Sequence, residues 1–167
     1  MNSTSARPEN ALFDAARRGD VALLQELLAT GLEINSADGK GFTALTLASY
    51  DDHLDAARFL LEAGADPNAQ DAAGNSALMG ISFKGYPTIA RLLIQHGADL
   101  NLQNGNGSTA LMFATMFGRN DVVKLLIEAG ANKEIKDARG LTALHLAAQH
   151  GNQGASALLG GPAPAQE

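Results

Sequence analysis

The sequence predicts an all-α repeat solenoid of five stacked helix-turn-helix units, joined by β-turn or hairpin connectors, with the first and last units acting as caps. Two observations predict this fold class. An Ala-Leu pair recurs every 33 residues, and two series of glycines keep the same interval. The pairs begin at Ala11, Ala44, Ala77, Ala110 and Ala143, and the glycines are Gly31, Gly64, Gly97 and Gly130, then Gly41, Gly74, Gly107 and Gly140. Such a period is typical of repeat arrays rather than of one closed globule.

The period divides the chain into consecutive units. They cover residues 5–37, 38–70, 71–103, 104–136 and a shortened 137–161. We expect one repeat domain over residues 8–160, with a flexible N-terminus at 1–7 and a disordered tail at 161–167, which contains small residues and prolines. Both end units suit contact with water, so the chain is expected to be a complete small protein.

Each full unit is predicted to open with a tight turn and a first helix. Asp or Asn is followed three residues later by Gly, as in Asp71 and Gly74, which favours a turn; the first unit has Ser5 and Pro8 at these places. A hydroxyl residue then precedes the Ala-Leu pair and predicts a helix N-cap. These caps are Thr43, Ser76, Thr109 and Thr142. A short first helix follows, such as residues 110–117.

A second helix is expected after a glycine, or after Asp52 in the second unit. In the fourth unit it covers residues 120–128, where Val123, Leu126 and Ile127 share one face at helical spacing. A following glycine, Gly130, is predicted to end it in the left-handed conformation. Asp tolerates that conformation better than most other residues, so Asp52 can replace the glycine.

Stacking of the units is expected to supply the hydrophobic core. The equivalent residues Leu45, Leu78 and Leu111 should form a continuous interior row. Each fully buried leucine contributes roughly 1.5–3 kcal/mol, so contacts between units should dominate stability. Apolar residues make up 46% of the chain and aromatic residues only 5%, which suits closely packed thin helices.

Composition narrows the classes of function. The net charge of −6 argues against partners that need clustered Lys and Arg, so we expect neither nucleic acid nor membrane as a partner. The chain has no cysteine, which excludes disulfides and thiol chemistry. Its first ten residues are polar, and no segment reaches the roughly 20 apolar residues of a membrane span. A cytoplasmic protein, monomeric when unbound, is therefore expected.

No side-chain pattern indicates catalysis. His96 stands at a helix end, where a donor suits the last carbonyl groups. His53 lies among Asp51, Asp52 and Asp55, but their spacing matches no metal-binding loop, and a solvated helix start is the simpler interpretation. We expect no cofactor and no metal. An enzyme is a remote alternative, because it would require polar groups that converge in a pocket.

The repeated motif resembles the ankyrin repeat. Residues 142–148, Thr-Ala-Leu-His-Leu-Ala-Ala, and residues 60–68, Leu-Leu-Glu-Ala-Gly-Ala-Asp-Pro-Asn, are close matches, and the resemblance covers about residues 8–160. It implies L-shaped units of two antiparallel helices with a protruding hairpin, and a structural role for His145. In every unit Ala replaces the proline of the family's Thr-Pro-Leu-His, and the fold should survive this because Ala is a good helix former.

The resemblance also suggests where a partner binds, since in ankyrin repeats two positions near the end of each first helix face a concave groove. Here these positions hold Arg17 and Arg18, Tyr50 and Asp51, Phe83 and Lys84, Met116 and Phe117, and Gln149 and His150. Exposed aromatic side chains favour an interface; alternatively, they pack as core. The turn tips add weaker candidates: Phe42, Arg139 and Leu141. Phe42 could instead pack onto the next turn.

The leading hypothesis is a non-catalytic adaptor that holds a helix or loop of a partner protein. The groove would be centred on Tyr50, Phe83, Met116 and Phe117, with charged neighbours that orient the partner. A sharper alternative is an inhibitor or immunity-type protein that neutralises one toxin or enzyme, and a role in stress response is similarly open. In length the chain resembles small stand-alone ankyrin proteins of the bacterial kind.

Overall fold

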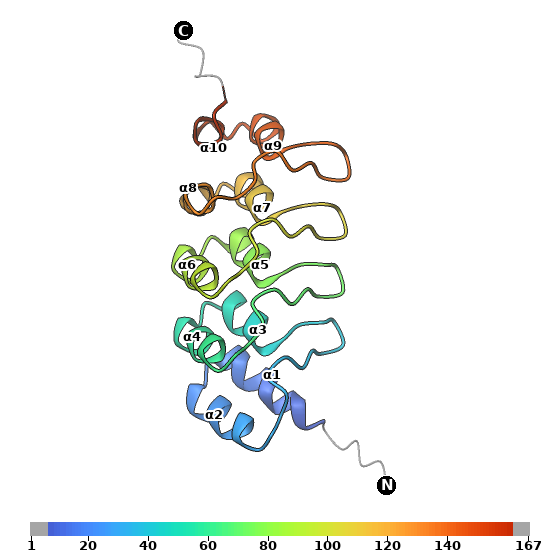
Figure 1. The fold of residues 1–167 in the computed structure, drawn as a ribbon, viewed down its shortest axis with the longest axis vertical. Helices are drawn as coiled ribbons and strands as arrows, with labels where there is room; N and C mark the ends of the chain where they lie inside the picture. Colours follow the sequence, from blue (N-terminus) through green and yellow to red (C-terminus); the bar gives the residue numbers. More distant parts are fainter. Residues whose placement is uncertain (1–6, 162–167) are drawn as a thin grey trace.

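The computed structural model describes residues 7–161, which form ten helices in a single column (Figure 1). The helices are α1 (Pro8–Arg18), α2 (Val21–Ala29), α3 (Ala44–Tyr50), α4 (Leu54–Glu62), α5 (Ala77–Lys84), α6 (Pro87–Gln95), α7 (Ala110–Met116), α8 (Asn120–Glu128), α9 (Ala143–Gln149) and α10 (Gln153–Leu158). The predicted flexible end and tail lie almost wholly outside the described residues, at 1–6 and 162–167.

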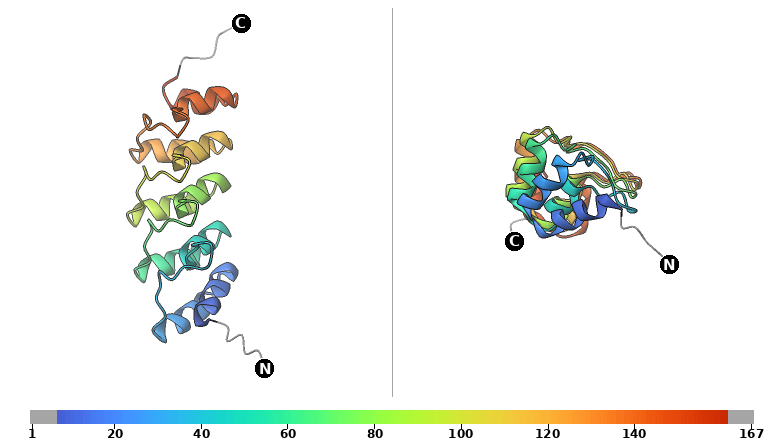
Figure 2. Two further views of the ribbon diagram at one scale, coloured as in Figure 1. Left: turned by 90° about the vertical axis from the view of Figure 1, so that its right-hand side faces the viewer. Right: turned by 90° about the horizontal axis from the view of Figure 1, so that it is seen from below.

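The helices form two layers that follow the chain from unit to unit. The odd-numbered helices stack on one another, the even-numbered helices stack beside them, and the connectors project together from one side (Figures 1 and 2). The predicted all-α solenoid of paired helices is confirmed. We call the surface made by the odd-numbered helices and their preceding turns the first-helix face. No helix in the described part is long and apolar enough to cross a membrane.

The first helices of the second to fifth units begin at the predicted caps. Thr43 Oγ1 accepts the Thr46 N–H at 3.2 Å, and the equivalent Ser and Thr side chains cap α5, α7 and α9. His145 completes a capping box, since its Nδ1 accepts the Thr142 N–H at 3.0 Å, which confirms its structural role. Asp52 has φ 61° and is the one non-glycine residue with positive φ in residues 7–161. It therefore ends its helix as the glycines do elsewhere.

The core is a row of equivalent side chains that runs through the stack. Leu45, Leu78 and Leu111 are at most 2% exposed, so the predicted interior row is confirmed. Alanines fill the remaining space between helices and let them approach closely, as do Ala44, Ala77 and the other buried alanines of the repeated Ala-Leu pairs. Each unit thus buries its apolar residues only by stacking on its neighbours.

The connectors are hydrogen-bonded turns rather than extended hairpins. Within the described residues, a single isolated bridge joins Ala37 and Thr43. Successive turns are tied together directly, as by the Gly105 N–H, which donates to the Ala73 carbonyl at 3.0 Å. Asparagine side chains form a second set of bonds between successive units, in which each Asn accepts a backbone N–H of the next unit. These bonds are Asn35 to Asp66, Asn68 to Asp99 and Asn101 to Asn132, at 2.7–2.8 Å.

Candidate functional site

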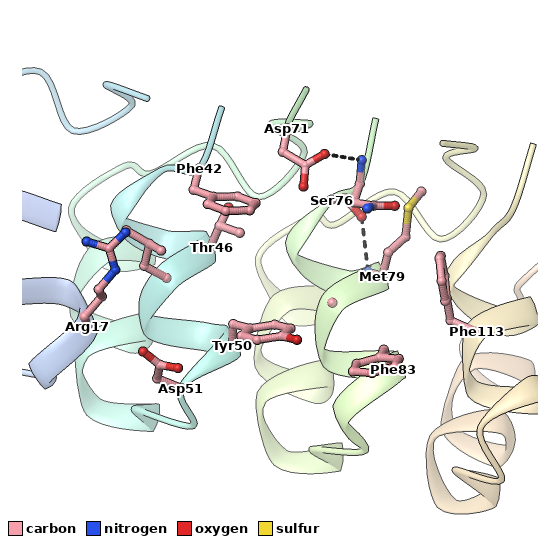
Figure 3. A pocket seen from close by; sticks show the side chains of 13 residues that line it. Arg17, Phe42, Thr46, Tyr50, Asp51, Asp71, Ser76, Met79, Phe83 and Phe113 are labelled. Atoms are coloured by element: carbon pink, nitrogen blue, oxygen red, sulfur yellow. Dashed lines mark hydrogen bonds between the residues drawn. The ribbon is translucent and has the colours of Figure 1, made fainter. Parts of the chain in front are cut away.

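A hollow of about 510 Å³ opens on the first-helix face, between the second, third and fourth units (Figure 3). Four aromatic rings and one thioether surround it, and polar side chains stand at its edge. Its lining residues are Arg17, Phe42, Thr46, Leu47, Tyr50, Asp51, Asp71, Asn75, Ser76, Met79, Gly80, Phe83 and Phe113. All of them belong to odd-numbered helices or to the turns beside them. The hollow is therefore a feature of the stack, since no single unit contains all its walls.

Gly80 leaves the hollow open. At the same place the second, fourth and fifth units have Leu47, Phe113 and Leu146. A Cβ atom added to Gly80 would lie 3.3 Å from Cδ2 of Tyr50, so a larger side chain would occupy the space beside that ring. Gly80 is not among the site residues predicted from the sequence. The signal was present, because a glycine stands inside a predicted helix where equivalent positions have large apolar residues.

The predicted groove aromatics contact one another diagonally between units. Lys84 Nζ lies 4.5 Å from the centre of the Tyr50 ring, in a cation–π contact. The Phe83 and Phe117 rings meet edge to face, with their centres 4.6 Å apart and their planes at 76°. Each first helix has two predicted groove residues near its end. In both contacts, the first of these residues in one unit (Tyr50 or Phe83) touches the second of them in the next unit (Lys84 or Phe117).

The sequence left open whether these side chains are exposed for a partner or packed as core, and their burial shows that both cases occur. Tyr50 is 40% and Phe117 46% exposed, and they are the exposed large apolar side chains of the described residues. Phe83 and Met116 are half-buried, and Met116 packs against the core. Gln149 and His150 are exposed on the last unit and do not line the hollow. The structure thus brings Arg17, Tyr50, Asp51 and Phe83 together at the hollow, while Phe117 extends the apolar surface beyond it.

The charged side chains near the hollow differ in their pairing. Arg17 Nη2 lies 3.6 Å from Asp38 Oδ2. Arg18 is paired with Asp14 at 2.8 Å, along the same helix. Asp51 is exposed at the edge of the hollow and forms no ion pair within residues 7–161. Lys84, which lies over the Tyr50 ring beside the hollow, also forms no ion pair within residues 7–161. The charged side chains in and beside the hollow are three acids, Asp38, Asp51 and Asp71, and two bases, Arg17 and Lys84, so the acids exceed the bases by one.

The candidates in the turns take different positions. Phe42 is half-buried and lines the hollow. Leu141 is half-buried against the core, and its N–H donates to Asp137 Oδ1 at 3.0 Å. Arg139 is bound within its own turn, since Nη2 and Nε donate to Asp137 Oδ2 at 2.8 and 3.1 Å. Arg139 and Leu141 thus contribute to the last turn, far along the stack from the hollow.

Three of the four histidines, His53, His96 and His145, are hydrogen-bonded within the scaffold. His53 Nε2 donates to the Arg17 carbonyl at 2.7 Å and so joins two units, which corrects the interpretation of a merely solvated helix start. His96 Nδ1 donates to the Leu92 carbonyl at 3.0 Å, as its place at a helix end predicts. Within residues 7–161, no group of three His, Cys, Asp or Glu side chains is placed to hold a metal ion.

Comparisons with known proteins agree with this geometry. The family model of ankyrin repeats (3 copies) matches residues 1–71 and 74–165. Over 52 residues the chain is 48% identical to ankyrin repeat domain-containing protein 29 of Danio rerio and 46% identical to the Homo sapiens protein of that name; each match covers 30% of this chain and 17% of the relative. Over 47 residues it is 47% identical to an ankyrin repeat protein of Pseudomonas aeruginosa, covering 28% of each. The matched segments span less than a third of these curated relatives. Because the family model covers nearly all of the sequence, the chain belongs to the ankyrin repeat family.

Proposed function

We propose that the chain is a non-catalytic module that binds a partner protein on its first-helix face. Ankyrin repeat domains are generally protein-binding modules and are typically not enzymes. The observation that supports this particular surface is the exposure of Tyr50 and Phe117. Exposed aromatic side chains beside a hollow are typical of interface centres, where they bury a large area on binding.

The contacts of the two exposed rings also favour binding. Lys84 packs over Tyr50 and Phe83 packs against Phe117, so each ring has a neighbour that restricts its orientation. A side chain that is already ordered loses less entropy when a partner covers it. These contacts leave much of each ring uncovered, since 40% of Tyr50 and 46% of Phe117 remain exposed. The remaining surface is available to a helix or loop of the partner.

The test compares affinity purifications from the source cell with three forms of the chain. The first is wild type, and the second replaces both exposed rings, as Tyr50→Ser with Phe117→Ser. The third is a control on the opposite layer, Arg91→Ser with Lys124→Ser, which changes exposed residues at equivalent places of α6 and α8. We expect at least one protein to be retained by wild type and the control but reduced about tenfold or more with the ring variant, as loss of interface aromatics predicts.

The proposal is wrong if the ring variant retains the same proteins as wild type, or if only the control loses them. Thermal unfolding of the three forms must be compared as well, because a large fall in the melting temperature of the ring variant would mean that these rings are core. If the retained protein is a toxin or enzyme that wild type inhibits, the role is that of an inhibitor or immunity-type protein.

A further inference from the structure

We infer that the hollow above Gly80 is a specificity pocket for one aromatic or long aliphatic side chain of the partner, and that a Lys or Arg of the same segment lies against Asp51. This inference rests on the proposed function, since it names the chemistry of the segment that the first-helix face would bind. It concerns a smaller part of that face and can fail while protein binding elsewhere on the face persists.

The backbone conformation at position 80 does not require a glycine. Gly80 lies inside α5 and is absent from the residues with positive φ, so its backbone suits any amino acid. A Cβ atom there would lie 3.3 Å from Cδ2 of the exposed Tyr50 ring, a tight contact that a small shift of that ring relieves, and no backbone atom of another element lies within 4 Å of it. Glycine inside a helix is less favourable than a residue with a side chain. The local result of Gly80 is an unfilled volume, which suits a binding pocket.

The walls of this volume favour an apolar occupant. The rings of Phe42, Tyr50, Phe83 and Phe113 stand around it, and Met79 lies beside them (Figure 3). A volume of about 510 Å³ has room for one large side chain together with the backbone to which it is attached. Aromatic rings and a flexible thioether adapt well to such a side chain.

The extent of the apolar surface favours a polypeptide over a small molecule. Phe117 does not line the hollow, yet it continues the surface onto the next unit through its edge contact with Phe83. A small molecule that fills the hollow would leave Phe117 uncovered. A segment of a partner protein can place one side chain above Gly80 and cover Phe117 with a neighbouring one.

The charge at the edge of the hollow favours a basic residue in that segment. The charged side chains that line the hollow are Arg17, Asp51 and Asp71. Arg17 is already paired with Asp38, and Asp71 accepts the N–H groups of its own turn at 2.9 Å. Asp51 is exposed and, within the described residues, has no ion-pair partner. Lys84 is also without one but lies over the Tyr50 ring, so Asp51 is the carboxylate at the hollow that is held neither by a base nor by its own turn. Complementary charge at an interface selects among partners, so a Lys or Arg is favoured here and an acidic residue is disfavoured.

The experiment uses a random peptide library displayed on phage, selected in parallel on wild type and on Gly80→Leu. This variant introduces the residue that Leu47 provides in the second unit. We expect the peptides enriched on wild type alone to contain an aromatic or long aliphatic residue and, near it, a Lys or Arg. The most enriched sequence, made as a synthetic peptide, should bind Gly80→Leu about tenfold or more weakly, because its side chain loses the buried site.

The contribution of the Asp51 charge is tested with the same synthetic peptide. Asp51→Asn should weaken its binding about threefold, as expected for one exposed ion pair. Asp121→Asn, which changes an exposed carboxylate on the opposite layer, should not change it. Circular dichroism establishes that each variant is folded, and Gly80→Ala replaces Gly80→Leu if the latter does not fold.

Several results would overturn this inference: no peptide enriched on wild type, enriched peptides that are acidic, or peptides that bind Gly80→Leu as tightly as wild type. Failure of the proposed function is recognised separately. Peptides or partners that are lost with Tyr50→Ser and Phe117→Ser, but not with Gly80→Leu, would contradict the pocket and leave binding on the first-helix face intact.

Discussion

The carboxyl group of Asp137 organises the turn before α9. It is almost fully buried, and its Oδ1 accepts the N–H groups of Arg139 and Leu141 at 2.9 and 3.0 Å while Oδ2 binds the Arg139 guanidinium. Burial by itself raises the pKa of this carboxyl, but the Leu141 N–H and the Arg139 contacts outweigh it and hold the pKa below its ordinary value of 3.8. In the fourth unit Asn104 accepts the same two backbone bonds without a charge, from Asn106 and Ser108.

This comparison predicts how Asp137→Asn changes stability with pH. The lowered pKa means that the ionised carboxyl stabilises the fold above its unfolded pKa of about 3.9, and that this contribution is lost as the pH falls through the folded pKa. Asn can keep the backbone bonds, as Asn104 does, but not the ion pair. We expect the variant to be less stable than wild type by about 1 kcal/mol near neutral pH.

Urea unfolding of both forms near neutral pH and below pH 3.8 tests this expectation. The difference in unfolding free energy between the two forms should shrink in acid. A difference that stays constant or grows as the pH falls would show that the charge of Asp137 is not what distinguishes the two side chains.

At the scale of whole elements, the connector turns pack against one another through glycine. A Cβ atom on Gly41, Gly74 or Gly107 would lie 2.8–2.9 Å from the backbone of the following turn. Gly140 ends the series, and no atom of the described residues lies within 4 Å of a Cβ placed there. All four have positive φ, as their turns require. The glycines of the inner units therefore allow both the positive φ and the close approach of the following turn, whereas Gly140 allows only the positive φ.

The comparison of Gly74→Ala with Gly140→Ala separates these two purposes. Both residues have nearly the same φ, 85° and 81°, so the strain of a left-handed alanine, about 1–2 kcal/mol, is common to both variants. In Gly74→Ala the new methyl group also forces the next turn away and weakens the bond from Gly105 N–H to the Ala73 carbonyl. We expect Gly74→Ala to be destabilised by at least about 1 kcal/mol more than Gly140→Ala.

Thermal and urea unfolding of the two variants beside wild type measure this difference directly. Equal losses of stability would mean that the close approach of successive turns contributes nothing beyond the conformation of each turn.

At the scale of the whole molecule, the units contact mainly their immediate neighbours. Helix α5 packs between α3 and α7, and α6 packs between α4 and α8. Within the described residues, α10 has only α8 beside it in the same layer. It is also short and contains one buried residue, Ala155, where α6 and α8 each bury several leucines, isoleucines or valines. Stability in such an array is close to a sum over units and the interfaces between them.

Hydrogen exchange should therefore reveal a gradient of stability along the column. We expect the amide protons of α10 to exchange about tenfold faster or more than those of α6 and α8, because fewer buried side chains oppose its local opening. Exchange measured residue by residue by NMR tests this, with α6 and α8 as internal references. Equal protection in the three helices would mean that the column opens only as one cooperative unit.

The repeat architecture of this protein could be predicted from its sequence. The same caps, turn glycines and leucines recur every 33 residues, and each acts within its own unit or against an equivalent neighbour. Local hydrogen bonds and periodic burial were therefore enough to predict the helices, their boundaries and the interior row of Leu45, Leu78 and Leu111. The left-handed conformation of Asp52 followed from the same pattern, because it stands where the other units have glycine.

The shape of the candidate site, in contrast, became known only from the folded structure. It showed that Tyr50 and Phe117 stay exposed while Phe83 and Met116 are half-buried, and that the space above Gly80 remains open. These outcomes depend on how side chains of different units orient against one another. The residues involved differ at each step of the period, so a repeated pattern contains no information about their mutual contacts, and their positions are set by the stacking of the folded units.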